Sequence, residues 1–193
     1  SIILGNSTGS HGIYYLRDGG ISLNTGGVSS VDVGRSGLGQ FYHINGKHQS
    51  SNVVIARELN ASGSLYRMTD GELNISGQLL VGVRGQGSFD QNGGTVDANV
   101  LEIGVQSGSA GSNYHLSGGN AFNHDPLVDG LFTDGKLDTS FMRLGAGDSA
   151  SFSQTGGLSI TNQLAIHDGA ITLNGGLFIA NEISNHSGHG VIN

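Results

Sequence analysis

Two histidines near the C-terminus form the segment HSGH, and histidine is a side chain that readily ligates metals and transfers protons near neutral pH. His186 and His189 lie three residues apart, a spacing that would let both imidazoles reach one ion. His43 and His115 are expected at equivalent outward places of a repeat, several units apart and too distant to share an ion. A polar tail is the simpler interpretation of HSGH, so we predict no metal site and no cofactor.

Acidic side chains gather in residues 124–140, HDPLVDGLFTDGKLDTS, which also contain the single proline. This segment contains four of the fifteen acidic residues: Asp125, Asp129, Asp134 and Asp138. Calcium binds several carboxylate and carbonyl oxygens, but the spacing fits neither the EF-hand loop nor the nonapeptide GGxGxD. A solvated loop or a small hairpin is the preferred interpretation, and the calcium hypothesis stays open.

The elements that would position these side chains are repeats. An aromatic or large apolar residue recurs before a glycine, mostly 23 to 27 residues apart, as in YHLSGG and FDQNGG. The anchors of this ladder, which we predict to point into the core, are Tyr15, Tyr42, Tyr66, Phe89, Tyr114, Phe152 and Ile171. A second signature, such as VDVG, LLVG or LEIG, accompanies each anchor. A period near two dozen residues is typical of a stacked repeat architecture.

Apolar residues within each repeat alternate with polar ones, which predicts strands with one buried face. In LEIG, for example, Leu101 and Ile103 share a face and Glu102 points the other way. A helix is excluded because glycine costs about 1 kcal/mol in a helix interior, and glycine interrupts every window of helical length. An antiparallel sandwich would also suit short strands, but it gives no reason for like residues at like places. We therefore predict an all-β fold, a parallel β-helix (β-solenoid) of about seven turns, forming one domain over residues 1–193 with an inserted loop at 124–140.

Catalysis on such a rod would require acidic or basic side chains at the same outward place of adjacent turns. The middle place of the first strand reads Asp32, Val54, Leu80, Glu102, Arg143 and Ala165. The place after the aromatic reads Leu16, His43, Arg67, Asp90, His115, Ser153 and Thr172. Neither series has adjacent carboxylates, so we predict no catalytic residues and no enzymatic activity.

Two glutamines stand where the repeat otherwise has an apolar residue two places after the aromatic. If Gln91 and Gln154 point inward, their amides are buried and need hydrogen-bond partners, which a corner of the backbone would supply. If the strand is slightly rotated, both side chains are exposed. The sequence leaves these two alternatives open.

Composition limits the partners. The net charge is −7 and the eight lysines and arginines are scattered, so we expect no nucleic-acid partner. No apolar run approaches the length of a membrane span, so we expect none. The absence of cysteine rules out disulfides and thiolate metal sites. The chain starts inside a repeat, and we expect a mature or excised form that lacks a processing segment.

The phrase VGVRGQGSFDQNGGTV resembles the β-strand repeats of bacterial exported proteins, in autotransporter passenger domains and PEP-CTERM-type surface proteins. Those repeats alternate GxGxFxQxGG with GxYxLSGG. The residues that match the first form are Gly85, Gly87, Phe89, Gln91, Gly93 and Gly94. The residues that match the second are Gly111, Tyr114, Leu116, Ser117, Gly118 and Gly119. The resemblance implies a parallel β-solenoid and a bacterial extracellular or cell-surface location.

Neither end of the array has an evident polar cap, although open strand edges template pairing. Two explanations follow: the chain is a slice of a larger array, or its ends stack head to tail into a filament. The residues of the expected assembly interface are Ile2, Ile3, Leu4, Leu177, Ile179, Ile183, Val191 and Ile192. We expect a structural subunit or segment of a surface or matrix fibre or adhesin, with itself and a glycan or surface molecule as partners. A carbohydrate-binding or carbohydrate-cleaving β-helix is the alternative.

Overall fold

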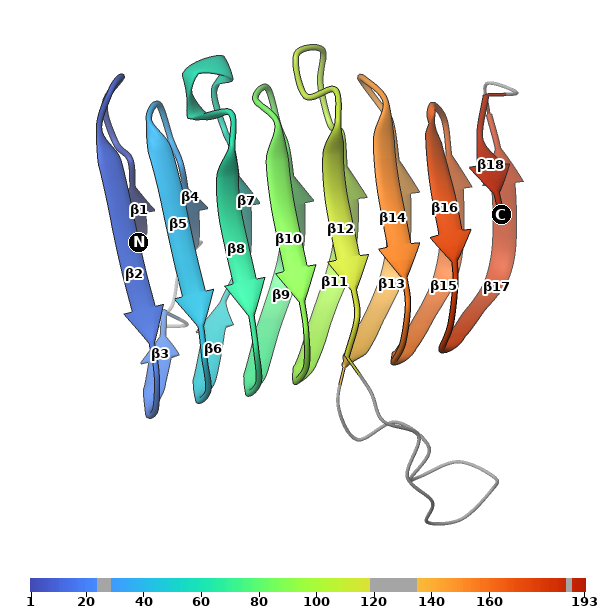
Figure 1. Ribbon diagram of the computed structural model, residues 1–193, viewed down its shortest axis with the longest axis horizontal. Helices are drawn as coiled ribbons and strands as arrows, with labels where there is room; N and C mark the ends of the chain where they lie inside the picture. Colours follow the sequence, from blue (N-terminus) through green and yellow to red (C-terminus); the bar gives the residue numbers. More distant parts are fainter. Residues whose placement is uncertain (24–28, 119–134, 187–188) are drawn as a thin grey trace.

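The computed structural model describes residues 1–23, 29–118, 135–186 and 189–193. The described chain coils into two sheets that face each other and run the length of a rod, with the N-terminus at one end and the C-terminus at the other (Figure 1). Every strand pairing is parallel, and each strand pairs with its equivalent one turn away. The predicted parallel β-solenoid is therefore confirmed.

The ten-stranded sheet carries the first signature of each repeat. Its strands in spatial order are β1 (Ile2–Leu4), β4 (Ser30–Val33), β7 (Asn52–Ile55), β9 (Glu72–Val81), β11 (Thr95–Ile103), β13 (Lys136–Leu144), β15 (Leu158–Ile166) and β17 (Leu177–Asn185). Two short strands, β3 (Gly20–Ser22) and β6 (Lys47–Ser50), pair with each other, and β6 also pairs with β9. β6 and β7 are separate strands that pair with the two halves of β9. In β9 and the later strands of this sheet, these two segments form one continuous strand.

The eight-stranded sheet carries the aromatic signature. Its strands are β2 (His11–Leu16), β5 (Leu38–His43), β8 (Ser64–Met68), β10 (Gly87–Gln91), β12 (Ser112–Leu116), β14 (Ala150–Gln154), β16 (Gly169–Leu173) and β18 (Val191–Ile192). A 3-10 turn, η1 (Leu59–Ala61), lies between β7 and β8. The stack has eight levels, one more than the repeat units recognised in the sequence, because β17 and β18 form a further level.

Residues 124–134 of the predicted insertion lie outside the described residues, and so does the calcium hypothesis for Asp125, Asp129 and Asp134. The C-terminal boundary of that loop was wrong. Lys136 pairs with Thr95 and with Leu158 in neighbouring strands, so residues 136–140 already belong to β13. The apolar and polar residues of KLDTS alternate in register with the neighbouring strands β11 and β15, so this segment forms a strand and not a loop.

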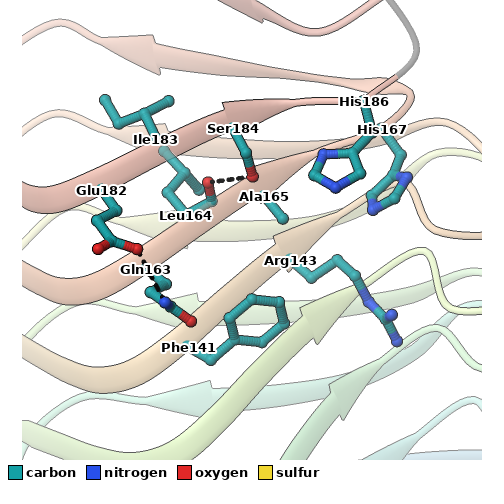
Figure 2. A pocket seen from close by; sticks show the side chains of 10 residues that line it. All are labelled: Phe141, Arg143, Gln163, Leu164, Ala165, His167, Glu182, Ile183, Ser184 and His186. Carbon is teal, nitrogen blue, oxygen red and sulfur yellow. Dashed lines mark hydrogen bonds between the residues drawn. The ribbon is translucent and has the colours of Figure 1, made fainter.

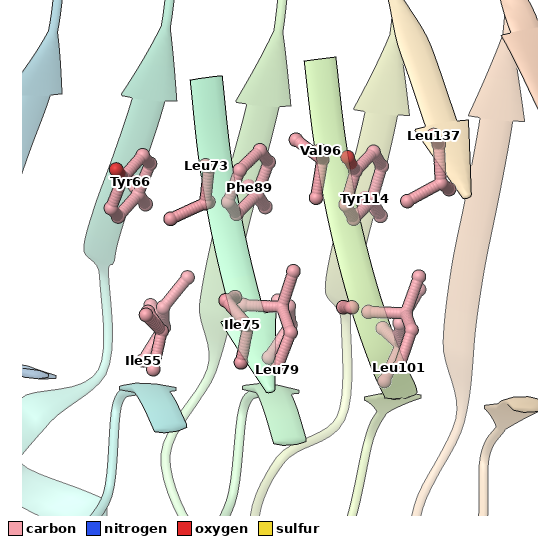
Figure 3. Packing of buried hydrophobic residues seen from close by; sticks show 14 of the residues in the cluster. Ile55, Tyr66, Leu73, Ile75, Leu79, Phe89, Val96, Leu101, Tyr114 and Leu137 are labelled. Atoms are coloured by element: carbon pink, nitrogen blue, oxygen red, sulfur yellow. The ribbon is translucent and has the colours of Figure 1, made fainter. Parts of the chain in front are cut away.

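Stacked aromatic rings fill the centre of the rod. The ring centroids of Tyr66 and Phe89 are 4.8 Å apart and those of Phe89 and Tyr114 are 4.7 Å apart, with nearly parallel planes. These distances match the spacing of hydrogen-bonded strands, about 4.8 Å. Phe152 and Ile171 continue the column, and both are fully buried. Figure 3 shows the rings beside the apolar side chains of the opposite sheet, Leu73, Val96 and Leu137.

Two anchors of the predicted ladder were wrong. Tyr14 and Phe41 occupy the column, whereas Tyr15 and Tyr42 point outward; Tyr15 is 53% exposed. Both segments contain adjacent aromatic residues, so alternation alone permits either register. The corner glycine decides: a glycine with positive φ follows the inward residue by five places in each of these turns, as with Gly46 after Phe41.

The same register turns His43 inward. The prediction that His43 shares an outward place with His115 was wrong, since His43 pairs with Met68 in an inward column and is fully buried. Gln91 and Gln154 also point inward, which settles the alternatives that the sequence left open. The Gln91 amide donates to the carbonyls of Gly94 and Lys136, and Tyr114 donates to its oxygen.

Candidate functional site

A trough lies on the outer face of the ten-stranded sheet, across β13, β15 and β17, near the C-terminal end of the rod. Its volume is about 700 Å³, within the range of small-molecule sites. Parallel register explains its shape. Arg143, Ala165 and Ser184 occupy one outward place on the three strands, so two small side chains form the floor and Arg143 closes one end.

The walls of the trough come from the places on either side of this floor. On one side, Phe141, Gln163 and Glu182 stand in register, and the Gln163 amide donates to the Glu182 carboxylate over 2.9 Å. The opposite wall consists of the rings of His167 and His186 (Figure 2). The trough therefore has an aromatic and amide wall, an imidazole wall and a guanidinium end.

The two imidazoles come from the corners that follow β15 and β17. Their ring centroids are 4.7 Å apart because the two residues occupy equivalent corners of neighbouring turns. Most earlier turns have a glycine at this corner, such as Gly145. Burial, the neighbouring His186 and the Arg143 guanidinium, in that order, lower the pKa of His167. The His167 ring is therefore neutral at neutral pH.

The sequence contains a signal for this pair that a search by local spacing misses. Spacing along the chain relates His186 to His189, but repeat alignment of QLAIH with EISNH places His186 beside His167. Among the described residues, no group of three or more His, Asp or Glu side chains lies close enough together to hold a metal ion.

Arg143 contributes the permanent cation of the trough. One terminal nitrogen of its guanidinium donates to the Glu102 carboxylate over 2.6 Å, which compensates the charge of both groups. Its Nε is buried and has no hydrogen-bond partner. An unpaired buried N–H costs about 1–3 kcal/mol, so the guanidinium is incompletely satisfied in this arrangement.

The outer face of the eight-stranded sheet carries a row of polar and aromatic side chains. Tyr15 stacks on Tyr42 at 4.9 Å between centroids, and the Arg67 guanidinium donates to the Asp90 carboxylate over 2.9 Å. Farther along the row, Oγ of Ser153 lies 2.7 Å from Nδ1 of His115. These are cross-strand pairs of the kind that stabilise sheets, and we assign the row to stability.

The predicted assembly residues lie on the end strands. Ile2, Ile3 and Leu4 form β1, which pairs with β4 alone among the described strands. At the other end, the exposed large apolar side chains of β17 and β18 are Leu177, Ile179, Ile183, Val191 and Ile192. Ile183 and Ile192 continue inward columns of the core, whereas Ile3 and Ile179 stand at outward places.

A buried polar cluster lies inside the N-terminal half of the rod. The Tyr66 hydroxyl lies 3.1 Å from Nδ1 of His43 and 3.1 Å from Nδ1 of His48, and all three side chains are fully buried. Burial, and secondarily the charge of His43, lower the pKa of His48 to about 3. Burial also lowers the pKa of His43. The cluster has no access to a ligand and bears on stability.

Comparisons with protein-family models, with curated proteins and with solved structures gave no match for this chain. Of the residues that the structure describes, none belongs to a helix with the length and apolarity that a membrane crossing requires. Functional inference therefore depends on the geometry of the trough and of the two ends.

Proposed function

We propose that the chain is a non-enzymatic structural rod of a bacterial surface or extracellular matrix, which associates end to end with further copies. The observation that carries this proposal is the continuity of the inward columns from one open end to the other. In both sheets each column contains one side chain per level, and the end strands present the terminal members of these columns.

Stacking the last level of one copy on the first level of another extends these columns in register. Ile183 belongs to the column that starts at Ile2, and Ile192 belongs to the ring column that starts at Tyr14. Both contacts join apolar side chains. The backbone edges of β17 and β1 would continue the parallel ladder, and a contact of this head-to-tail kind does not close and so generates a filament.

The surface location is supported by the resemblance of the repeats to those of bacterial exported proteins and by the cysteine-free composition. A long array of hydrogen-bonded strands around a continuous core suits a load-bearing fibre or the stalk of an adhesin. The proposal assigns the work of the protein to its shape and its ends.

A charge at the end of the ring column tests the assembly. Ile192 is 47% exposed, so Ile192→Lys leaves the core of a single copy nearly unchanged but buries an ammonium against Tyr14 in a filament. We expect wild-type protein to form filaments visible by electron microscopy, and Ile192→Lys to raise the required concentration more than tenfold. The matched control is Leu59→Lys, because Leu59 is 63% exposed on the 3-10 turn between β7 and β8, which belong to neither end of the rod.

Wild-type protein that sediments as a monomer at every concentration would contradict this function. Equal loss of assembly in the Leu59 and Ile192 variants would show that added charge, and not the ring column, controls association.

A second function, carbohydrate binding, is favoured by one observation: the trough on the lateral face combines an aromatic side chain with amide, hydroxyl and carboxylate groups. Small-molecule sites combine an apolar or aromatic lining with a few polar groups that fix the orientation of the ligand. A glycan array probed with the dilute protein tests this function, and the absence of binding to any glycan would exclude it.

A further inference from the structure

We propose that the trough across β13, β15 and β17 binds an oligosaccharide that carries an anionic group, with this group held between Arg143, His167 and His186. The inference deepens the carbohydrate-binding function and rests on it. It identifies the class of sugar and assigns a role to each wall of the trough.

The polarity of the two ends of the trough supports an anionic ligand. Three groups able to donate hydrogen bonds or carry positive charge line the trough: the guanidinium of Arg143 at its β13 end, and the imidazoles of His167 and His186 along one wall (Figure 2). A divalent cation at the histidine pair would be repelled by Arg143, whose charge already disfavours protonation of His167. An anion is attracted by the same charge, and guanidinium binds carboxylate and sulfate oxygens well.

The remaining groups fit the neutral part of a sugar. Gln163 and Ser184 lie on the wall and floor and provide an amide and a hydroxyl, and Phe141 provides an apolar ring beside them. Glu182 accepts a hydrogen bond from Gln163 and lies on the wall opposite the imidazoles (Figure 2), where its carboxylate can also accept from sugar hydroxyls. A small anion such as acetate would fill only the cationic end and would leave most of the trough empty.

Proton uptake should accompany binding. The charged and titratable groups around the trough are Glu102 from β11, Arg143 from β13, His167 after β15, and Glu182 and His186 from β17 and its end. Because Glu102 partly compensates Arg143, the attraction for an anion increases when His167, whose pKa is lowered in the free protein, takes up a proton. If one proton is taken up on binding, the affinity rises about tenfold for each unit by which the pH is lowered, as long as the imidazole of the free protein is still neutral.

The test compares ligands and two matched variants by titration calorimetry on the full chain. The ligands are trigalacturonate, a sulfated disaccharide of glucosamine and uronate, neutral maltotriose, and sodium acetate. Ala165→Leu fills the floor of the trough, and leucine fits there because the same outward column carries Leu80. The control is Ala170→Leu on β16 of the opposite sheet, in an outward column that carries Leu65.

We expect at least one of the two acidic saccharides to bind at least tenfold more tightly at pH 5.5 than at pH 7.5. Ala165→Leu and His186→Gln should each weaken that binding at least tenfold, while Ala170→Leu leaves it unchanged. The two acidic ligands distinguish a carboxylate from a sulfate as the recognised group.

Equal or tighter binding of maltotriose would overturn this inference and leave the carbohydrate-binding function intact. Failure of every saccharide, with or without acetate binding, would overturn both. Zinc binding that competes with the saccharide at His167 and His186 would overturn the assignment of the imidazoles to an anion.

Discussion

Acid should destabilise the rod through His48, which the core buries without a charge partner. Between pH 6.5, the ordinary histidine pKa, and the lowered pKa of about 3, the unfolded chain binds a proton at this site and the folded chain does not. The stability contributed by the neutral ring is therefore complete above pH 6.5 and is lost as the pH falls toward 3. At about 1.4 kcal/mol per pH unit, the loss reaches about 5 kcal/mol across this interval.

The variant His48→Leu removes this titration and suits its surroundings. His48 stands in an inward column between Ile21 and Leu73, and its Nε2 is buried without a hydrogen-bond partner. The Tyr66 hydroxyl loses one contact but keeps His43. At pH 7.5 we expect the free energy of unfolding to change by less than about 1.5 kcal/mol, because a lost hydrogen bond and a removed unsatisfied nitrogen offset each other.

The assay is urea unfolding followed by far-ultraviolet circular dichroism at pH values from 7.5 to 4. We expect His48→Leu to gain stability relative to wild type by about 1.4 kcal/mol for each pH unit below 6.5. The control His11→Leu removes an exposed histidine from β2 and should follow the wild-type pH dependence. Parallel loss of stability in wild type and His48→Leu would refute the reasoning, because it would place the acid-sensitive groups elsewhere.

Two further variants test the core. Phe41→Ala should destabilise the fold by about 3–5 kcal/mol, whereas the neighbouring Tyr42→Ala, on the outer face, should cost less than about 1 kcal/mol. Thermal melts of the two variants measure this difference, and a larger loss for Tyr42→Ala would show that Tyr42, not Phe41, points into the core. Gln91→Leu should cost about 1–3 kcal/mol because it leaves the buried Tyr114 hydroxyl without its acceptor and removes two amide hydrogen bonds to backbone carbonyls. Adding Tyr114→Phe should recover part of that cost in denaturant titrations, and strictly additive losses would contradict the shared hydrogen bond.

The architecture was readable from the sequence because it is repeated locally. Alternation in segments such as residues 101–103 indicates strands, and glycines with a recurring spacing indicate corners. Each turn can therefore be recognised from its own sequence. Likeness between turns then identifies a parallel stack, since only that arrangement places equivalent residues next to each other. Tyr66, Phe89 and Tyr114 lie in one column for this reason.

Alternation alone did not decide the register where it was ambiguous. Adjacent aromatic residues at 14–15 and 41–42 satisfy alternation in two ways, and the structure shows that the inward residue is the one five places before the corner glycine. The inward turn of His43 and its contact with Tyr66 follow from that choice. Whether Gln91 is buried was equally undecided, because its partners include the carbonyl of Lys136, which is 45 residues away in the chain.

The sequence by itself determined the fold class, the spacing of the turns and the residue types that fill the core, because these depend on periodicity within and between repeats. Only the tertiary structure decided which outward side chains stand together. Arg143, His167 and His186 are separated by 19 to 24 residues from one to the next. They share a trough because the parallel pairing of β13, β15 and β17 places Arg143 beside Ala165 and the corner residue His167 beside His186. Proximity of this kind is a property of register, and register is fixed by the pairing of whole strands.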